Sequence, residues 1–149
     1  MSDETPQFIG EYEEVPVDAK GRLIFPAAFR KALPMGVNTF VVARWFDGCR
    51  GAYDPIGWKR VLEKLQGLSG AKRETRQLIR AVAGRATEVR LDSQGRVLIP
   101  RKHLEMAGIT DQATLIGVID RVEIWRPEDY RQRIDEVDLE GIAEDLDWI

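Results

Sequence analysis

A nine-residue pattern occurs twice in this chain of 149 residues, with its two copies 74 positions apart. The first copy, residues 18–26, reads DAKGRLIFP, and the second, residues 92–100, reads DSQGRVLIP. Both copies contain an aspartate, a Gly-Arg pair, three apolar residues and a closing proline. Because chance rarely repeats such a pattern in one chain, the sequence predicts an internal duplication in which Arg22 and Arg96 have the same role.

The similarity between the two copies continues beyond the motif. After each motif the sequence predicts a short helix, a β-rich segment and a longer helix that begins at Pro55 or at Pro127. Proline suits the first turn of a helix, since its missing N–H would have no partner there. Each copy therefore reads strand, strand, short helix, two strands, helix. A unit of this size cannot bury its apolar faces alone, so we expect the two copies to share one core.

These patterns predict a single domain over residues 8–134 followed by an acidic tail. Repeat 1 (8–70) and repeat 2 (84–134) would be joined by a helix over 72–83 that carries a basic stripe. The tail, 135–149, contains seven acidic residues and no basic one. Its apolar residues recur at helical spacing: Leu139, Ile142, Leu146 and Ile149. We expect an amphipathic tail that docks on a partner, covers the basic surface or remains solvated.

The charge of the chain is distributed unevenly along the sequence. The net charge is −3, but residues 15–102 contain 18 basic and only 7 acidic side chains. Residues 1–14 and 103–149 are acidic in balance. A basic block that contains both motifs indicates either a phosphate-binding surface or a solvated basic face flanked by acidic segments.

Composition also narrows the classes of function. The chain has one cysteine, Cys49, and one histidine, His103, with no phosphate-binding Gly-rich loop and no spaced cluster of metal ligands. We therefore expect no enzyme activity, no catalytic residue, no cofactor, no metal and no small-molecule substrate. His103 occupies the position of Phe29 in the other copy, so we expect it to be partly buried.

Three features of the sequence bear on where the protein is located. No apolar run reaches the roughly 18 residues that a membrane span requires. Residues 1–7 are polar and acidic and do not resemble a signal peptide. A single cysteine excludes an intrachain disulfide and suits a reducing cytosol. We expect a cytoplasmic protein that does not enter a membrane.

The residue types of the motif predict its local structure. An aspartate and a glycine favour a tight turn, the three apolar residues indicate a buried strand, and the proline ends that strand. The arginine then lies at the corner between turn and strand, where its guanidinium can contact phosphate or guanine through two hydrogen bonds. The alternative is a structural Asp-Arg pair that only stabilises a hairpin, and both roles can hold together.

Several segments of the chain resemble the MraZ family of bacterial transcriptional regulators. They are the opening FIGEY (8–12), both motifs, PAAFR (26–30), WFDGC (45–49) and AGI (107–109). The resemblance extends from residue 8 to about residue 134. It implies an α+β, mainly β fold: a pseudo-symmetric swapped-hairpin β-barrel of the AbrB type, built from two repeats with peripheral helices.

The resemblance also implies a function. The chain is expected to be a sequence-specific DNA-binding regulator, without catalytic activity, whose partners are double-stranded DNA and further copies of itself in a ring-like homo-oligomer. The DNA site would be short tandem repeats upstream of the bacterial division and cell-wall gene cluster, which implies association with the nucleoid. Two alternatives remain: an antitoxin-like AbrB-type regulator with other targets, and an oligomeric protein-interaction module that does not bind DNA.

The motif positions yield two sets of candidate residues. The expected DNA contacts are Lys20, Arg22, Arg30, Arg96, Arg101 and Lys102. The expected structural positions of the motif are Asp18, Gly21, Pro26, Asp92, Gly95 and Pro100. Repeat 2 departs from repeat 1, since Gln94 replaces Lys20 and Leu104 replaces Arg30. Arg101 and Lys102 are expected to restore charge at the second corner from the neighbouring turn.

Overall fold

The structure is a computed structural model, and it describes residues 6–148 of the chain. Residues 1–5 and Ile149, which was predicted on the apolar face of the tail, lie outside the described residues. The first half forms β1 (Phe8–Pro16), β2 (Arg22–Ile24), α1 (Ala27–Ala32), β3 (Thr39–Arg44), the 3-10 turn η1 (Phe46–Gly48), β4 (Arg50–Tyr53) and α2 (Pro55–Gln66).

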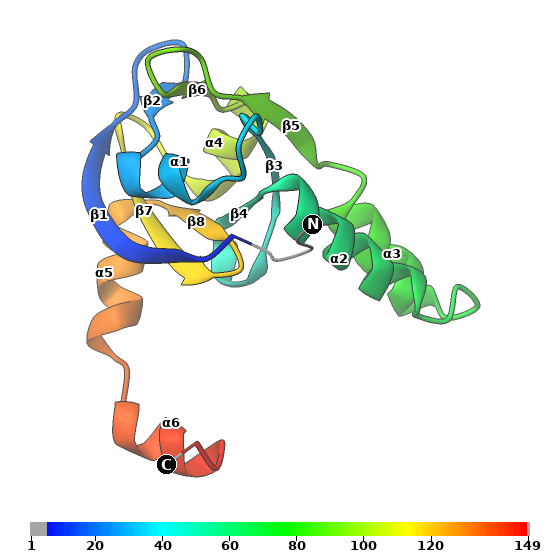
Figure 1. The fold of residues 1–149 in the computed structure, drawn as a ribbon. Helices are drawn as coiled ribbons and strands as arrows, with labels where there is room; N and C mark the ends of the chain where they lie inside the picture. The colour runs from blue at the N-terminus through cyan, green and yellow to red at the C-terminus, as the bar shows by residue number, and fades with distance from the viewer. Residues whose placement is uncertain (1–5, 149) are drawn as a thin grey trace.

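After one connecting helix, the second half repeats this order of strands and helices, and it then adds a final short helix (Figure 1). It forms α3 (Arg73–Val82), β5 (Thr87–Arg90), β6 (Arg96–Leu98), α4 (Arg101–Ala107), β7 (Gln112–Ile119), β8 (Val122–Trp125), α5 (Pro127–Asp135) and α6 (Leu139–Asp145). The prediction of two strands, a short helix, two strands and a helix in each copy is therefore confirmed.

The longer helices begin where the sequence predicts. Asp54 is the N-cap of α2, since its carboxylate accepts hydrogen bonds from the N–H groups of Ile56 (3.0 Å) and Gly57 (3.2 Å). Leu65 of α2 and Val82 of α3 are buried together with Ala43 of β3. The apolar faces of α2 and α3 thus pack on the same strand and form a satellite of the main core.

Strands from both halves combine in one antiparallel sheet with the order β1-β7-β8-β4-β3-β5. β1 pairs with β7 and β4 pairs with β8, so each half contributes strands on both sides of the contact. The main core lies against this sheet and includes Phe8, Phe29 and Phe40 from the first half with Leu115 and Ile124 from the second. The expectation that the two copies share one core is confirmed.

The motif strands form a second, separate sheet. β2 pairs antiparallel with β6, so that Leu23 lies opposite Val97 at the centre of the pair. Neither sheet closes on itself, because β1 and β5 remain edge strands and the β2–β6 sheet has only two strands. An α+β, mainly antiparallel fold is therefore present, but the predicted swapped-hairpin barrel is not confirmed.

Two sequence predictions about burial were wrong in part. Each apolar triplet was expected to be buried, but its middle residue is exposed: Ile24 by 56% and Leu98 by 54%. A short strand alternates its side chains between two faces, so only the first and third residues of each triplet reach the core. His103, expected to be partly buried, is only 1% exposed.

None of the helices between residues 6 and 148 combines the length and the hydropathy that crossing a membrane requires.

Candidate nucleic-acid interface

The first motif forms a turn whose aspartate holds the backbone and the side chain of its arginine; we call residues 18–22 the first corner. One carboxylate oxygen of Asp18 accepts hydrogen bonds from the backbone N–H groups of Lys20 and Arg22, both at 2.9 Å. The other oxygen accepts from Nε of Arg22 at 2.8 Å. The N–H of Gly21 donates to the carbonyl of Asp18, and Gly21 has a φ of +91°, which favours glycine.

The second motif repeats this arrangement; we call residues 92–96 the second corner. Asp92 accepts from the backbone N–H groups of Gln94 (2.8 Å) and Arg96 (2.9 Å), and from Nε of Arg96 (2.7 Å). Gly95 has a φ of +79° and donates its N–H to the carbonyl of Asp92. The predicted Asp-Arg pairing therefore occurs in both copies with the same hydrogen bonds.

The pairing keeps both carboxylates ionised well below neutral pH. Hydrogen bonds from the N–H and guanidinium of Arg22 lower the pKa of Asp18 from 3.8 to about 2. Arg96 lowers the pKa of Asp92 to the same value. Each arginine uses Nε for this bond, and its Nη nitrogens have no partner in the described part of the chain. With about 40% of each arginine side chain exposed, these nitrogens can donate to an external ligand.

The two corners meet through the pairing of β2 with β6. Arg22 lies opposite Leu98, and Ile24 lies opposite Arg96. Side chains of directly opposed residues share one face of a sheet, so these four residues share the outward face while Leu23 and Val97 point into the core. The ribbon therefore presents two oriented guanidinium groups around a pair of exposed aliphatic side chains.

Backbone hydrogen bonds cross between the corners with approximate two-fold symmetry. The N–H of Phe25 donates to the carbonyl of Gly95, and the N–H of Ile99 donates to the carbonyl of Gly21, each at 2.9 Å. Phe25 and Ile99 occupy the same position in their repeats. Each corner is thus supported by the strand end of the other repeat, which fixes the separation of Arg22 and Arg96.

An arginine from each helix that follows a motif reaches the corner of the other repeat. The guanidinium of Arg30 in α1 lies against Gly95 of the second corner and donates through Nε to the carbonyl of Phe25 at 2.9 Å. Arg101 of α4 reaches the first corner, where its Nη2 donates to the carbonyl of Ala19 at 3.3 Å. The expectation that Arg101 restores charge at its own corner was therefore wrong, because each cation crosses to the other repeat.

The remaining motif residues have structural or solvent-facing positions. Pro26 and Pro100 cap α1 and α4, where their carbonyls accept the first helical N–H groups. The side chains of Lys20 and Lys102 are exposed, with no partner in the described range. The structure therefore gathers Lys20, Arg22 and Arg101 at the first corner, and Arg96 and Arg30 at the second.

The basic stripe predicted on α3 is only partly available to a ligand. Arg76 turns back toward the loop before its helix, where its Nη1 donates to the carbonyls of Gly70 and Ala71, both at 3.0 Å. This contact joins the helix to the preceding loop. The exposed positions Ile24 and Leu98 were instead missed by sequence reasoning, because a run of three apolar residues does not show whether one face of the strand is open.

The two residues considered for catalysis are both buried. Cys49 donates its thiol to the carbonyl of Phe46 at 3.3 Å, and burial raises its pKa to about 12. Burial and the nearby Arg50 lower the pKa of His103 to about 4. No group of three or more His, Cys, Asp or Glu side chains within the described residues is placed to hold a metal ion.

A comparison with protein families matches almost the whole chain. The model of the MraZ family, described as "MraZ protein, putative antitoxin-like", matches twice, over residues 8–81 and 82–146. Each match contains one corner and its helix, in agreement with the duplication seen in the sequence and in the hydrogen bonds. This chain belongs to the MraZ family.

Proposed function

We propose that this protein is a sequence-specific, double-stranded-DNA-binding transcriptional regulator that reads DNA with the β2–β6 ribbon. The observation that carries the proposal is the pair of aspartate-held arginines, Arg22 and Arg96, on the outward face of one ribbon. A two-stranded ribbon fits the major groove of B-DNA, where arginine is the commonest partner of guanine.

Because each arginine is paired with an aspartate, it is better suited to recognising a base sequence than to attracting DNA of any sequence. Asp18 offsets most of the charge of Arg22 at a distance while fixing the plane of its guanidinium. An oriented guanidinium with two available Nη groups favours hydrogen bonds to a base edge, whereas an unpaired cation favours phosphate. The unpaired Lys20 and Lys102, together with Arg30 and Arg101, are then proposed as the phosphate-binding cations.

The family suggests the target. We propose that the ribbon binds short tandem repeats upstream of the division and cell-wall gene cluster, and that several copies assemble in a ring-like homo-oligomer at the nucleoid. One ribbon makes a small contact and would bind weakly. Linked ribbons gain from effective concentration, so an array of repeats would be bound far more tightly than one repeat.

We also propose that the chain forms the swapped-hairpin barrel that its resemblance to the MraZ family implies. The crossed hydrogen bonds Phe25–Gly95 and Ile99–Gly21 support it, because each repeat completes the corner of the other. An experimental structure with DNA would test it through the pairing of β1 and β5 with their neighbours.

The experiment is fluorescence anisotropy with a duplex that carries the upstream repeats of the protein's own gene, and with a scrambled duplex, over a series of salt concentrations. We expect the wild type to prefer the repeats and Arg22→Ala to lose that preference. Arg131→Ala, which removes an exposed arginine on α5, is the matched control and should bind as the wild type. Equal binding of both duplexes by the wild type would contradict the proposal.

The family description favours a second candidate, an antitoxin-like regulator of the same fold with other DNA targets. The exposed acidic helix α6 is the observation that supports it, since such a tail can hold a partner protein. Salt-sensitive binding to duplexes other than the upstream repeats would favour this candidate. An absence of DNA binding at low salt would instead favour a protein-interaction module.

A further inference from the structure

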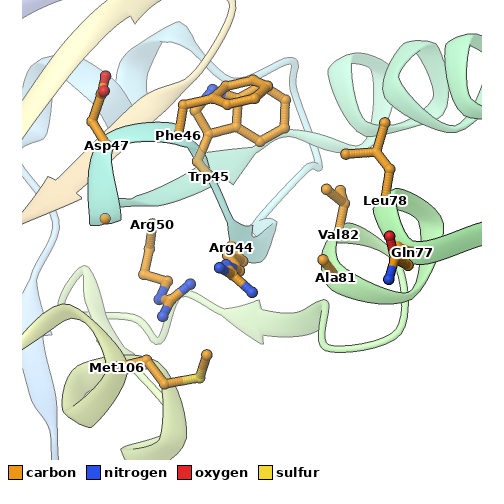
Figure 2. A pocket seen from close by; sticks show the side chains of 11 residues that line it. Arg44, Trp45, Phe46, Asp47, Arg50, Gln77, Leu78, Ala81, Val82 and Met106 are labelled. Atoms are coloured by element: carbon orange, nitrogen blue, oxygen red, sulfur yellow. The ribbon is translucent and has the colours of Figure 1, made fainter. Parts of the chain in front are cut away.

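A partly apolar groove with a cationic floor lies away from the β2–β6 ribbon, between the β3–η1–β4 hairpin and helices α3 and α4 (Figure 2). Its volume is about 650 Å³. The residues that define it here are Arg44, Phe46, Arg50, Leu78 and Met106. A neighbouring hollow of about 570 Å³ shares Trp45, Phe46, Leu78 and Val82 with it, so the two form a continuous surface. We therefore treat the two hollows as one candidate docking surface.

Two arginines give the groove its charge. Arg44 and Arg50 are cross-strand partners in the β3–β4 pair, and Figure 2 shows both guanidinium groups beside the hollow. Arg50 is only 3% exposed, and its hydrogen bond goes to the carbonyl of His103 at 3.3 Å. Neither arginine forms an ion pair with a carboxylate of the described residues. The nearby Asp47 is already paired with Arg133 at 3.3 Å.

A buried guanidinium beside a second cation is costly unless an anion approaches it. Desolvation, followed by the charge of Arg44, lowers the pKa of Arg50. Asp47 also lines the groove, but it is paired with Arg133, so Arg44 and Arg50 have no anionic partner among the described residues. A carboxylate from outside the groove would offset that cost.

The walls of the groove are apolar and accessible. Phe46 is 65% exposed, Met106 is 41% exposed and Leu78 is 37% exposed. Large exposed apolar side chains gathered around charged groups are typical of binding sites rather than of bare surface. An occupant that suits this groove has apolar side chains on one face and carboxylates beside them.

Helix α6 has those properties and exposes its large apolar side chains. Leu139, Ile142 and Leu146 share one helical face and are 67%, 47% and 73% exposed. Every charged residue from 135 to 149 is acidic. Figure 1 shows α6 extending beyond α5, away from both sheets. A helix of seven residues is marginal without packing, so it gains most from a surface that buries its apolar face.

We propose that α6 of one copy docks in the Arg44–Arg50 groove of a second copy. Its apolar face would cover Phe46 and Met106, and its carboxylates would face the two arginines. The tail and the groove lie on different surfaces, so the contact is heterologous and propagates around a ring when its rotation closes. This inference rests on the proposed self-assembly and names the contact that produces it.

The test links the two surfaces of different molecules. One variant carries Met106→Cys and a differently tagged one carries Ile142→Cys; they are mixed and treated with a short bismaleimide. We expect a covalent product that contains both tags. Met35→Cys replaces Met106→Cys in the matched control, since Met35 is fully exposed in the loop between α1 and β3. The native Cys49 is 1% exposed with a pKa of about 12, so it reacts little.

A charge reversal tests the arginines separately. Arg44→Glu should weaken assembly in sedimentation by roughly tenfold, because it opposes the acidic tail. Lys59→Glu makes the same charge change on the exposed surface of α2 and should assemble as the wild type. Reduced assembly of Arg44→Glu alone, together with the two-tag product, supports the proposal.

Three results would overturn it. A two-tag product no more abundant than the Met35→Cys control would show that the groove does not receive the tail, while an assembled wild type would leave the proposed function intact. A monomeric wild type would remove both this contact and the ring, and anisotropy would still decide DNA binding by the ribbon. Lower DNA affinity of Arg44→Glu with unchanged assembly would make the groove a phosphate site instead.

Discussion

The two corners of the ribbon share one backbone scaffold but differ in the side chains around it. In both, an aspartate accepts three hydrogen bonds, two from the arginine and one from the backbone N–H two residues after the aspartate. The first corner adds Lys20 and receives Arg101 from α4, whereas the second has the neutral Gln94 and receives Arg30 from α1. The duplicated turn therefore sets the geometry, each corner receives one arginine from the other repeat, and Lys20 against Gln94 makes the difference in charge. The first corner is the more positive and should bind DNA more strongly.

The largest expected difference between the corners is in the DNA affinity that is lost when the arginine of each is replaced by alanine. Arg22→Ala should weaken binding to the tandem repeats by about a hundredfold or more, since each lost bidentate contact costs about 1–3 kcal/mol and recurs in every linked copy. Arg96→Ala should weaken it by roughly tenfold, because fewer cations support its corner. Anisotropy titrations on one duplex measure both.

Equal losses for the two variants would break the comparison and make the ribbon functionally symmetric. Thermal unfolding is the control here, since each substitution leaves its aspartate without its guanidinium partner. The ion pairs are about 40% exposed, so neither variant should lose its fold.

Local sequence patterns predicted the elements of the corners but not their exchange. The turn, the strand and the proline of each motif follow from residues within nine positions of one another. The arrival of Arg30 at Gly95 and of Arg101 at Ala19 depends on the antiparallel pairing of β2 with β6, which joins segments 74 residues apart. Nothing in the spacing of a single motif encodes that pairing.

The burial of the triplets was also beyond a local reading. A run of three apolar residues fits both a fully buried strand and a half-buried one, and periodicity cannot separate them over so short a length. The outward position of Ile24 and Leu98 follows from the two-stranded sheet, whose outer face no element between residues 6 and 148 covers.

A second difference between the repeats lies in the helices that follow the motifs, where His103 of α4 stands in place of Phe29 of α1. Its Nε2 lies 3.3 Å from the Thr87 hydroxyl, while Nδ1 has no hydrogen-bond partner among the described residues. Because the pKa is about 4 in the fold and 6.5 otherwise, the unfolded chain binds more protons between these values. The free energy of unfolding should therefore fall by up to about 1.4 kcal/mol per pH unit as pH drops from 6.5 to 4.

Urea unfolding at several pH values checks this slope against His103→Gln, which removes the titrating group. The variant should lose the pH dependence in this window and retain the loss near pH 3, where the aspartates of the two corners approach their pKa of about 2. Identical slopes for both proteins would assign the effect to other groups.

The two corner glycines should differ in how well they tolerate alanine. Both have positive φ, which costs a residue with a Cβ about 1–2 kcal/mol. A Cβ at Gly21 would lie 2.8 Å from the carbonyl oxygen of Ile99, whereas one at Gly95 would lie 2.6 Å from the guanidinium of Arg30. A side chain can move more easily than a backbone carbonyl, so Gly21→Ala should destabilise the protein more than Gly95→Ala.

Denaturant midpoints rank the two variants, and DNA binding separates their effects further. Gly95→Ala displaces Arg30 from its hydrogen bond with Phe25, so it should alter binding at the second corner even where the fold is retained. A larger loss of stability for Gly95→Ala would mean that Arg30 is fixed as firmly as the backbone.

Exchanging the neutral and basic residues of the turns tests the comparison with the smallest expected effect. Lys20→Gln should lower the salt slope of DNA binding by about one and weaken affinity a fewfold, since it removes one phosphate-binding cation. Gln94→Lys should do the opposite to a similar extent if the second corner touches DNA. Both positions donate only their backbone N–H to the aspartate, so the turns should be unchanged. An unchanged slope for Gln94→Lys beside a lowered one for Lys20→Gln would place phosphate contact at the first corner alone.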